Sequence, residues 1–121
     1  MDYRSTVEYR SQLYPDVTVT LKRVSFSRRN DLTRLLAPLA AKARSLAAST
    51  NDKDVAEASM VRREMARLVL EWGIVDVAGI HVDGAPITKQ LLLEDGPEEL
   101  PMEILGELQR QISLDEEQRK N

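Results

Sequence analysis

The only histidine of the chain, His81, lies in the sequence between two carboxylates, Asp76 and Asp83. These three side chains are the first candidates for a catalytic or metal-binding site. Imidazole and carboxylate groups bind metals and act as general bases. A metal site, however, needs three or four ligands on a rigid frame. Asp83-Gly84 is also a tight-turn signal, so the turn by itself explains the presence of Asp83. We therefore interpret residues 68–86 as a helix end followed by a hairpin, with no catalytic or metal-binding residue.

Other signatures of catalysis or nucleotide binding are missing from the sequence. It contains none of the patterns GxxxxGK[ST], GxGxxG and GxSxG, and it has no cysteine, which removes thiolate chemistry and disulfides. A serine nucleophile would have to pair with His81, and no nucleophile elbow lies near it. We expect a protein that is not an enzyme and that needs no cofactor.

The size and composition of the chain predict a single domain over residues 1–121. With one Phe, three Tyr and one Trp, its core must consist mainly of Leu, Val, Ile and Ala. The N-terminus lacks the regions of a signal peptide, and no stretch reaches the roughly 18 apolar residues of a membrane span. We expect a location in a reducing cytoplasm and no contact with a membrane.

Charge is distributed unevenly along the sequence. Residues 1–50 carry nine Lys/Arg against four Asp/Glu, a net charge of +5, and residues 51–121 carry eight against sixteen, a net charge of −8. This polarity fits self-association through opposite ends, two partners of opposite sign, or two solvated faces of one small domain. We favour the last interpretation.

Alternating residues predict an N-terminal hairpin over residues 5–24. Pro15-Asp16 supplies the turn, because proline fixes φ and aspartate hydrogen-bonds the turn backbone. The apolar positions of the two strands are Val7, Tyr9, Leu13, Val17, Val19 and Leu21.

Apolar residues at helical spacing predict two amphipathic helices within residues 27–72. The first begins near Ser27 or Asn30, residue types that cap helices well, and Pro38 should kink or split it near Leu36. Its stripe comprises Leu32, Leu35, Leu36, Leu39, Ala43, Leu46 and Ala47.

The second helix is expected over residues 54–72. We predict that it ends at Gly73 because glycine tolerates the left-handed conformation at a helix terminus. Its stripe comprises Val55, Ala58, Val61, Met65, Leu68, Val69 and Trp72.

The remaining residues predict a small hairpin at 75–87, turning at Asp83-Gly84, and C-terminal helices at 88–119. Thr88 should cap a short helix that breaks at 95–97, and a longer helix at 98–112 should hold Pro101 in its first turn. Residues 113–116 have the form of a capping box that starts a final turn. The buried positions of the longer helix are expected at Leu100, Ile104, Leu105, Leu108 and Ile112. The expected fold is α+β: a hairpin, two helices, a second small hairpin and C-terminal helices.

A basic cluster surrounds the start of the first helix. Phosphate groups bind such charges, and Phe26 offers a ring on which a base can stack. A pI near 5.2 and the lack of any known nucleic-acid-binding signature make nucleic acid the least favoured partner. The cluster comprises Lys22, Arg23, Arg28, Arg29 and Arg34.

Three groups of segments carry a resemblance to a known family. They are residues 24–32 (VSFSRRNDL); 70–74 (LEWGI) with 79–86 (GIHVDGAP); and 96–100 (GPEEL) with 103–104 and 115–121 (DEEQRKN). Their order is similar to that of small proteins from phage and prophage tail modules, the tail assembly chaperones of long-tailed phages. The resemblance spans most of residues 17–121.

The resemblance implies a non-enzymatic protein that binds the long, helical tape measure protein in the host cytoplasm, keeps it from aggregating and helps to recruit tail tube subunits. A longer, frameshifted product is common in that family, and a chain that stops at Asn121 corresponds to the short form. An apolar helix face with a charged rim suits such a client. We predict that the client surface comprises Leu32, Leu35, Leu36 and Leu39, flanked by Arg28, Arg29 and Arg34.

Two alternatives stay open beside the chaperone hypothesis. A structural tail or head-tail connector component would remain in finished virions, which an assembly chaperone does not. A small nucleic-acid-binding protein would bind with an affinity that falls steeply with salt.

Overall fold

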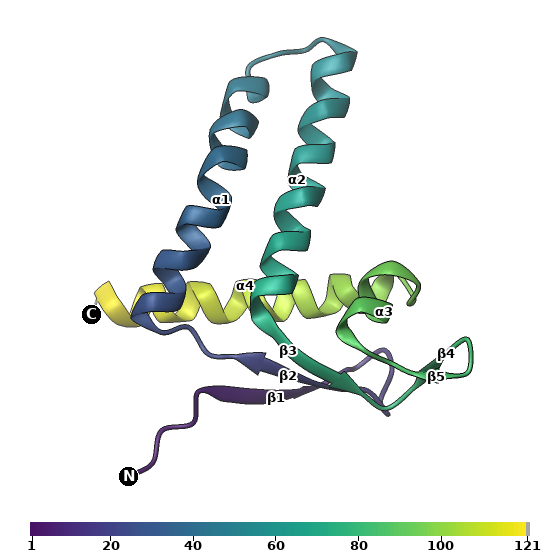
Figure 1. Cartoon of the computed structure of the whole chain (residues 1–121). Helices are drawn as coiled ribbons and strands as arrows, with labels where there is room; N and C mark the ends of the chain where they lie inside the picture. Colours follow the sequence, from purple (N-terminus) through teal and green to yellow (C-terminus); the bar gives the residue numbers. More distant parts are fainter. Residues whose placement is uncertain (121) are drawn as a thin grey trace. The chain divides into compact units, whose positions relative to one another are not determined.

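The computed structural model describes residues 1–120, and it describes side chains as far as Ser113. The fold is mixed α+β, with the predicted order of hairpin, two long helices, small hairpin and C-terminal helices (Figure 1). The chain groups into two compact units. We call residues 1–24 and 70–121 the sheet unit and residues 25–69 the helical unit, and describe each by itself. The expectation of a single domain over 1–121 stays a prediction.

The sheet unit is built on three antiparallel strands. They are β1 (Thr6–Arg10), β2 (Thr18–Lys22) and β3 (Ile74–Ala78), in the order β1-β2-β3. Val17, Val19 and Leu21 are completely buried, as the alternation predicted for this strand. The predicted hairpin over residues 75–87 is partly wrong. Residues 75–78, expected in its first strand, belong to β3 and pair with β2 instead. A continuous strand gains more from a place in a larger sheet than from an isolated two-stranded ribbon.

The connection between β1 and β2 turns at Pro15-Asp16, as predicted. The backbone N–H of Val17 donates to the carbonyl of Tyr14 at 2.8 Å, and the N–H of Ser11 donates to the carbonyl of Val17 at 3.0 Å. Because β1 ends at Arg10, Leu13 lies in this connection and is 56% exposed. Its predicted place among the strand residues is therefore wrong.

The small hairpin is shorter than expected and consists of β4 (His81–Val82) and β5 (Ala85–Pro86). Asp83 and Gly84 have φ values of 50° and 83°, and two consecutive positive φ values are typical of the type I′ turn that this dipeptide favours. The turn signal in the sequence is therefore confirmed.

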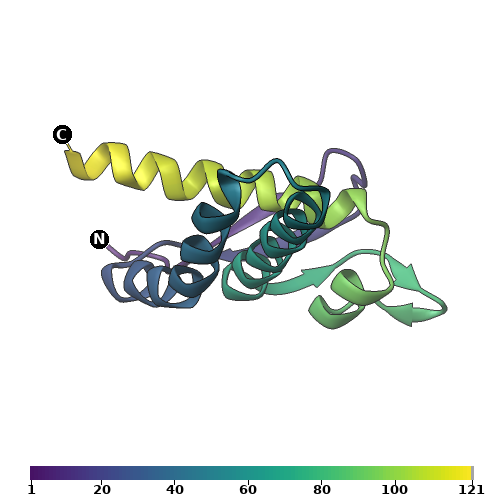
Figure 2. The same ribbon diagram turned by 90° about the horizontal axis from the view of Figure 1, so that it is seen from above.

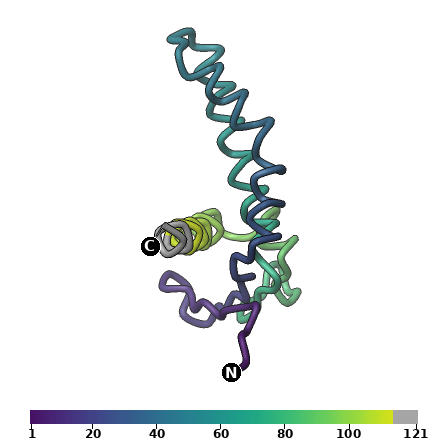
Figure 3. The backbone as a smooth tube through the Cα atoms, turned by 90° about the vertical axis from the view of Figure 1, so that its left-hand side faces the viewer, coloured from purple at the N-terminus to yellow at the C-terminus, as the bar shows by residue number. Residues whose placement is uncertain are grey.

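Two helices complete the sheet unit: α3 (Lys89–Glu94) and α4 (Glu99–Lys120). Thr88 caps α3 as predicted, since its hydroxyl accepts the N–H of Leu91 at 3.1 Å. The predicted capping box at 113–116 is wrong, because α4 continues through these residues without a new start. Figure 3 looks along α4 and shows the β1–β2 hairpin beside it. The core includes the predicted Leu100, Ile104, Leu105 and Leu108, together with Leu92 of α3.

The helical unit contains α1 (Phe26–Ala47) and most of α2 (Asp52–Gly73). Figure 1 shows the two helices running antiparallel, and Figure 2 shows them from above. The hydroxyl of Ser25 accepts the N–H of Arg28 at 3.2 Å and caps α1, so the helix begins before the predicted Ser27 or Asn30. The predicted split at Pro38 is also wrong, because α1 continues through it. A proline removes one backbone hydrogen bond, which a 22-residue helix tolerates when the rest of its turns persist.

The helix α2 ends at Gly73 as predicted, but the reason for the glycine is different. Gly73 is the last helical residue, but it does not have a positive φ. A Cβ at this position would lie 2.5 Å from Cδ2 of Leu108 and 2.8 Å from its Cδ1. Close packing against α4 within the sheet unit, rather than a left-handed conformation, therefore accounts for the glycine.

Candidate functional site

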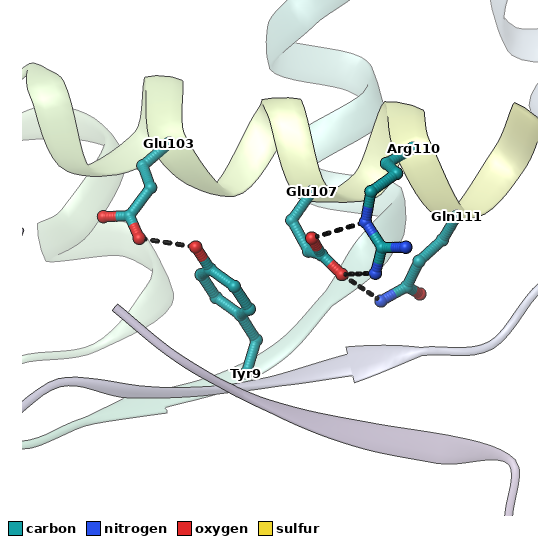
Figure 4. Close-up of polar contacts among 5 residues, drawn as sticks. All are labelled: Tyr9, Glu103, Glu107, Arg110 and Gln111. Carbon is teal, nitrogen blue, oxygen red and sulfur yellow. Dashed lines mark hydrogen bonds and ion pairs between the residues drawn. The ribbon is translucent and has the colours of Figure 1, made fainter. Parts of the chain in front are cut away.

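Polar contacts concentrate where β1 and its connection meet α4. The hydroxyl of Tyr9 donates to Oε2 of Glu103 at 2.6 Å, and Ser11 Oγ donates to Oε1 at 2.7 Å. The backbone N–H of Gln12 donates to Oε2 at 2.8 Å. We call Tyr9, Ser11, Gln12 and Glu103 the Glu103 cluster; Figure 4 shows the contact between Tyr9 and Glu103.

Residue spacing along both elements brings this cluster together. Tyr9 and Ser11 are two residues apart and so project from the same side of the extended chain, toward α4. Glu99, Glu103 and Glu107 follow at intervals of four on one side of α4. A row of three carboxylates on the helix therefore runs alongside the hydroxyl groups of the hairpin.

The two outer glutamates of the row have partners of their own. Glu99 accepts a hydrogen bond from the hydroxyl of Tyr14. Glu107 binds Arg110 through Oε1 to Nη2 at 2.5 Å and through Oε2 to Nε at 3.0 Å, and its Oε1 also accepts Nε2 of Gln111 at 3.0 Å (Figure 4). All three carboxylates of the row are thus engaged by groups of the chain itself.

The electrostatics of the cluster keep Glu103 ionised and Tyr9 protonated. Burial raises the pKa of Glu103, but hydrogen bonds from Tyr9, Ser11 and two backbone N–H groups outweigh burial and lower it below its ordinary value. The hydrogen bond to Glu103, then burial and the carboxylate charge, raise the pKa of Tyr9 to about 12. Hydrogen bonding to Tyr14 lowers the pKa of Glu99 in the same way.

The Glu103 cluster joins the N-terminal hairpin to α4. Both carboxylate oxygens of Glu103 accept hydrogen bonds from the chain, and Ser11 Oγ accepts a further one from the N–H of Tyr14 at 2.9 Å. A strand at Tyr9 and a helix at Glu103 were both predicted correctly, but the contact between these two residues was not predicted. The period of four among the three glutamates was the signal that the sequence offered.

The side chains around the histidine are not gathered into one site. Asp76 lies in β3, opposite Thr20 of β2, whereas His81 lies in β4 and Asp83 in the hairpin turn; the three are exposed. Asp83 therefore belongs to the turn and not to the strand that contains His81. Among the residues whose side chains are described, no group of three or more His, Cys, Asp or Glu has an arrangement that would hold a metal ion.

The four leucines of the predicted client surface lie on α1 and differ in exposure. Leu32 is buried, Leu36 and Leu39 are half-buried, and Leu35 is 46% exposed. Leu32 therefore belongs mainly to the core of the structure, and the other three keep apolar surface in water.

The three arginines predicted to flank these leucines lie on different sides of α1. Arg28 and Arg29 are half-buried, and burial lowers the pKa of Arg28, partly offset by the nearby charge of Asp31. Arg34 is exposed and lies two residues from both Leu32 and Leu36, which places it on the opposite side of the helix. Only Arg28 and Arg29 therefore border the leucine stripe.

The helical unit buries few apolar side chains along its length. Within residues 25–69 the buried ones are Leu32, Ala58, Val61 and Val69, three of which are alanine or valine. Val55, predicted to be buried, is 51% exposed because it lies in the first turn of α2, at the tip of the two-helix unit. The ion pair of Lys42 Nζ with Glu57 Oε1, at 2.9 Å, links the two helices.

Comparisons of the chain with family models, curated proteins and solved structures yield no match. Across the part of the chain that is described, none of the helices combines the length and apolar character that a bilayer crossing requires.

Proposed function

We propose that this chain is a non-enzymatic protein-binding module that acts as a phage tail assembly chaperone. In this proposal it binds and solubilises the helical tape measure protein in the host cytoplasm. The observation that carries the proposal is the partial exposure of the α1 leucines: Leu35 is 46% exposed, and Leu36 and Leu39 are half-buried. The identity of the client comes from the sequence resemblance.

The geometry of a two-helix unit supports binding of a helix. The apolar stripe of α1 keeps part of its surface in water, since Leu35 is 46% exposed and Leu36 and Leu39 are half-buried. An amphipathic client helix that lies along α1 would bury this surface. Burial of apolar area gains about 25 cal/mol per Å², which makes the half-buried leucines the natural contacts.

Charge supports a client helix with acidic flanks. The helical unit carries nine Lys/Arg and five Asp/Glu, a net charge of +4. Opposite charges on a rim steer encounter and orient the partner more than they add affinity. We therefore expect client segments in which acidic residues border the apolar stripe.

Substitution of Leu35 by aspartate tests the proposal. Leu35→Asp places a charge on the exposed apolar surface of α1, and we expect co-expressed tape measure protein to pass from the soluble to the insoluble fraction. The matched control is Leu13→Asp, a leucine of similar exposure in the sheet unit, which should leave the client soluble. Circular dichroism and thermal unfolding of both variants establish that each is folded.

Three results would contradict the proposal. The first is a client that stays soluble with Leu35→Asp, and the second is a client that is equally insoluble with and without the native chain. The third is presence of the chain at fixed stoichiometry in purified tails, which would make it a structural component. Binding to DNA that weakens steeply with salt would instead support the nucleic-acid alternative.

A further inference from the structure

The strand β1 lies at an edge of the three-stranded sheet, and its backbone indicates which groups face outward. In an antiparallel pair, alternate residues direct both their N–H and their C=O toward the partner strand. The carbonyl of Ser5 accepts the N–H of Arg23 at 2.8 Å, and the N–H of Ser11 donates to the carbonyl of Val17 at 3.0 Å. Both pairs continue the register of β1 with β2. The odd-numbered residues of β1 therefore direct their backbone N–H and C=O groups toward β2.

The even-numbered residues of β1 therefore direct their backbone groups away from β2. The order β1-β2-β3 places no other described strand on that side. Such a row of N–H and C=O groups is a template for pairing with another strand. We call these residues the β1 edge; they are Thr6, Glu8 and Arg10.

The side chains of the β1 edge carry opposite charges. Glu8 and Arg10 are both exposed, and residues two apart on a strand lie on the same face of the sheet. Tyr9 lies on the other face, which contacts α4 through Glu103. An added strand would therefore lie beside the acidic Glu8 and the basic Arg10. Both side chains lie on the face opposite Tyr9, so the added strand would not disturb the Glu103 cluster.

Charge complementarity between Glu8 and Arg10 favours a second copy of β1 as that strand, in a register that sets these two residues opposite each other. An antiparallel pair that sets Glu8 opposite Glu8 brings two acids together, and one that sets Thr6 opposite Glu8 brings Arg4 opposite Arg10. The pair that sets Glu8 opposite Arg10 forms two identical pairs of opposite charge, with Tyr9 on the symmetry axis. Opposite charges directly across a strand pair stabilise it, and like charges destabilise it.

We propose that two copies of the chain pair antiparallel through their β1 edges, with Glu8 of each copy opposite Arg10 of the other. The contact joins two three-stranded sheets into one sheet of six strands. It is isologous, so it closes at two copies and leaves neither β1 edge open. The contact requires no client, and its test uses the purified chain alone.

Neutralising Glu8 tests the register. By sedimentation velocity of the full chain, we expect Glu8→Gln to raise the dissociation constant of the dimer about tenfold, roughly 1.4 kcal/mol, because both charge pairs are lost. The matched control is Glu98→Gln, the same chemistry at an exposed position just before α4, which should leave the dimer unchanged. A native chain that stays monomeric at every concentration would overturn the proposal. Tighter association of Glu8→Gln would overturn the register, since it would indicate Glu8 opposite Glu8.

Charge reversal on each side of the pair provides a mixing experiment. Glu8→Arg leaves only arginine at positions 8 and 10, and Arg10→Glu leaves only glutamate there. Each variant should be monomeric alone, and the two mixed together should form a one-to-one dimer, because every acid then meets a base. Lack of pairing in the mixture would contradict the proposed contact.

A proline at position 8 separates backbone pairing from charge. Glu8→Pro and Glu8→Gln both remove the carboxylate, but only proline also removes the outward N–H, which an edge strand does not need for its own fold. We expect the dimer to be weaker with proline than with glutamine, while circular dichroism of the two variants stays alike. Equal association of the folded variants would show that β1 does not pair through its backbone.

Discussion

Glu103 illustrates how one side chain joins parts of the chain that are distant in sequence. It accepts hydrogen bonds from Tyr9, Ser11 and the backbone of Gln12, all of which lie in the N-terminal hairpin. Hydrogen bonds to an ionised group are stronger than those between neutral groups. If the carboxylate were removed, its partly buried donors would lack an acceptor, and the cost of removing them from water would no longer be offset. The carboxylate of Glu103 therefore stabilises the hairpin against α4.

Neutralising Glu103 should destabilise the protein in a pH-dependent manner. We expect Glu103→Gln to lower the free energy of unfolding by about 2 kcal/mol at neutral pH, since charge-assisted hydrogen bonds are lost. The pKa of Glu103 is lower in the folded chain, so its contribution is complete above the unfolded pKa and is lost as pH falls through the folded pKa. Urea unfolding from neutral to strongly acidic pH should show the native and variant curves converging at the acidic end.

The control for this prediction is again Glu98→Gln, a change of the same chemistry at an exposed position outside the cluster. It should leave the free energy of unfolding within about 0.5 kcal/mol of the native value. An equal loss of stability in both variants would show that general charge, rather than the Glu103 cluster, is responsible.

At the scale of elements, glycines fix the path from β3 to α3. Gly79 has a φ of 121°, and a Cβ there would lie 1.8 Å from the carbonyl oxygen of Asp16. Gly84 also has a positive φ, but its missing Cβ faces open space. The first glycine lets the chain pass closely over the β1–β2 connection, and the second only completes a turn.

Alanine substitution should distinguish the two glycines. We expect Gly79→Ala to cost at least about 3 kcal/mol, because backbone strain adds to a steric clash that backbone atoms cannot relieve. Gly84→Ala should cost about 1 kcal/mol, the strain of a left-handed residue alone. Denaturant unfolding of the two variants compares them directly, and costs of similar size would contradict the close approach of Gly79 to Asp16.

At the scale of the whole molecule, the two units differ in how they are stabilised. The sheet unit contains the fully buried residues Val17, Val19, Leu21, Leu100 and Ile104, whereas the helical unit buries few apolar side chains. The sheet unit carries eight Lys/Arg and fifteen Asp/Glu, a net charge of −7, against +4 for the helical unit. One unit therefore combines a well-buried core with a negative net charge, and the other combines sparse apolar burial with a positive net charge.

Hydrogen exchange should reveal this difference. Amide protons of α1 and of residues 52–69 should exchange faster than those of β2 and of residues 100–108, because sparse burial permits local opening at lower free energy. Mass spectrometry of exchanged peptides measures both groups in one experiment. Equal protection in the two units would contradict the contrast, and slower exchange in α1 after addition of the client would support the proposed binding surface.

The sequence alone determined the element types, most of the turns and much of the core. Local rules were sufficient for these features: alternation for β2, helical spacing for α1 and α2, Asp83-Gly84 for the type I′ turn and Thr88 for the α3 cap. Several errors arose where a second segment intervened. β3 pairs with β2, and Gly73 accommodates Leu108.

Only the tertiary structure decided which surfaces meet and which stay open. Two examples are the pairing of Tyr9 with Glu103 and the position of β1 at the edge of the sheet. Both depend on contacts between residues far apart in sequence, and the type and spacing of neighbouring residues do not predict such contacts. The exposure of Leu35 likewise depends on how many helices surround α1 rather than on its apolar stripe. Periodicity indicates which face of a helix is apolar, but burial is a property of the neighbours that cover it.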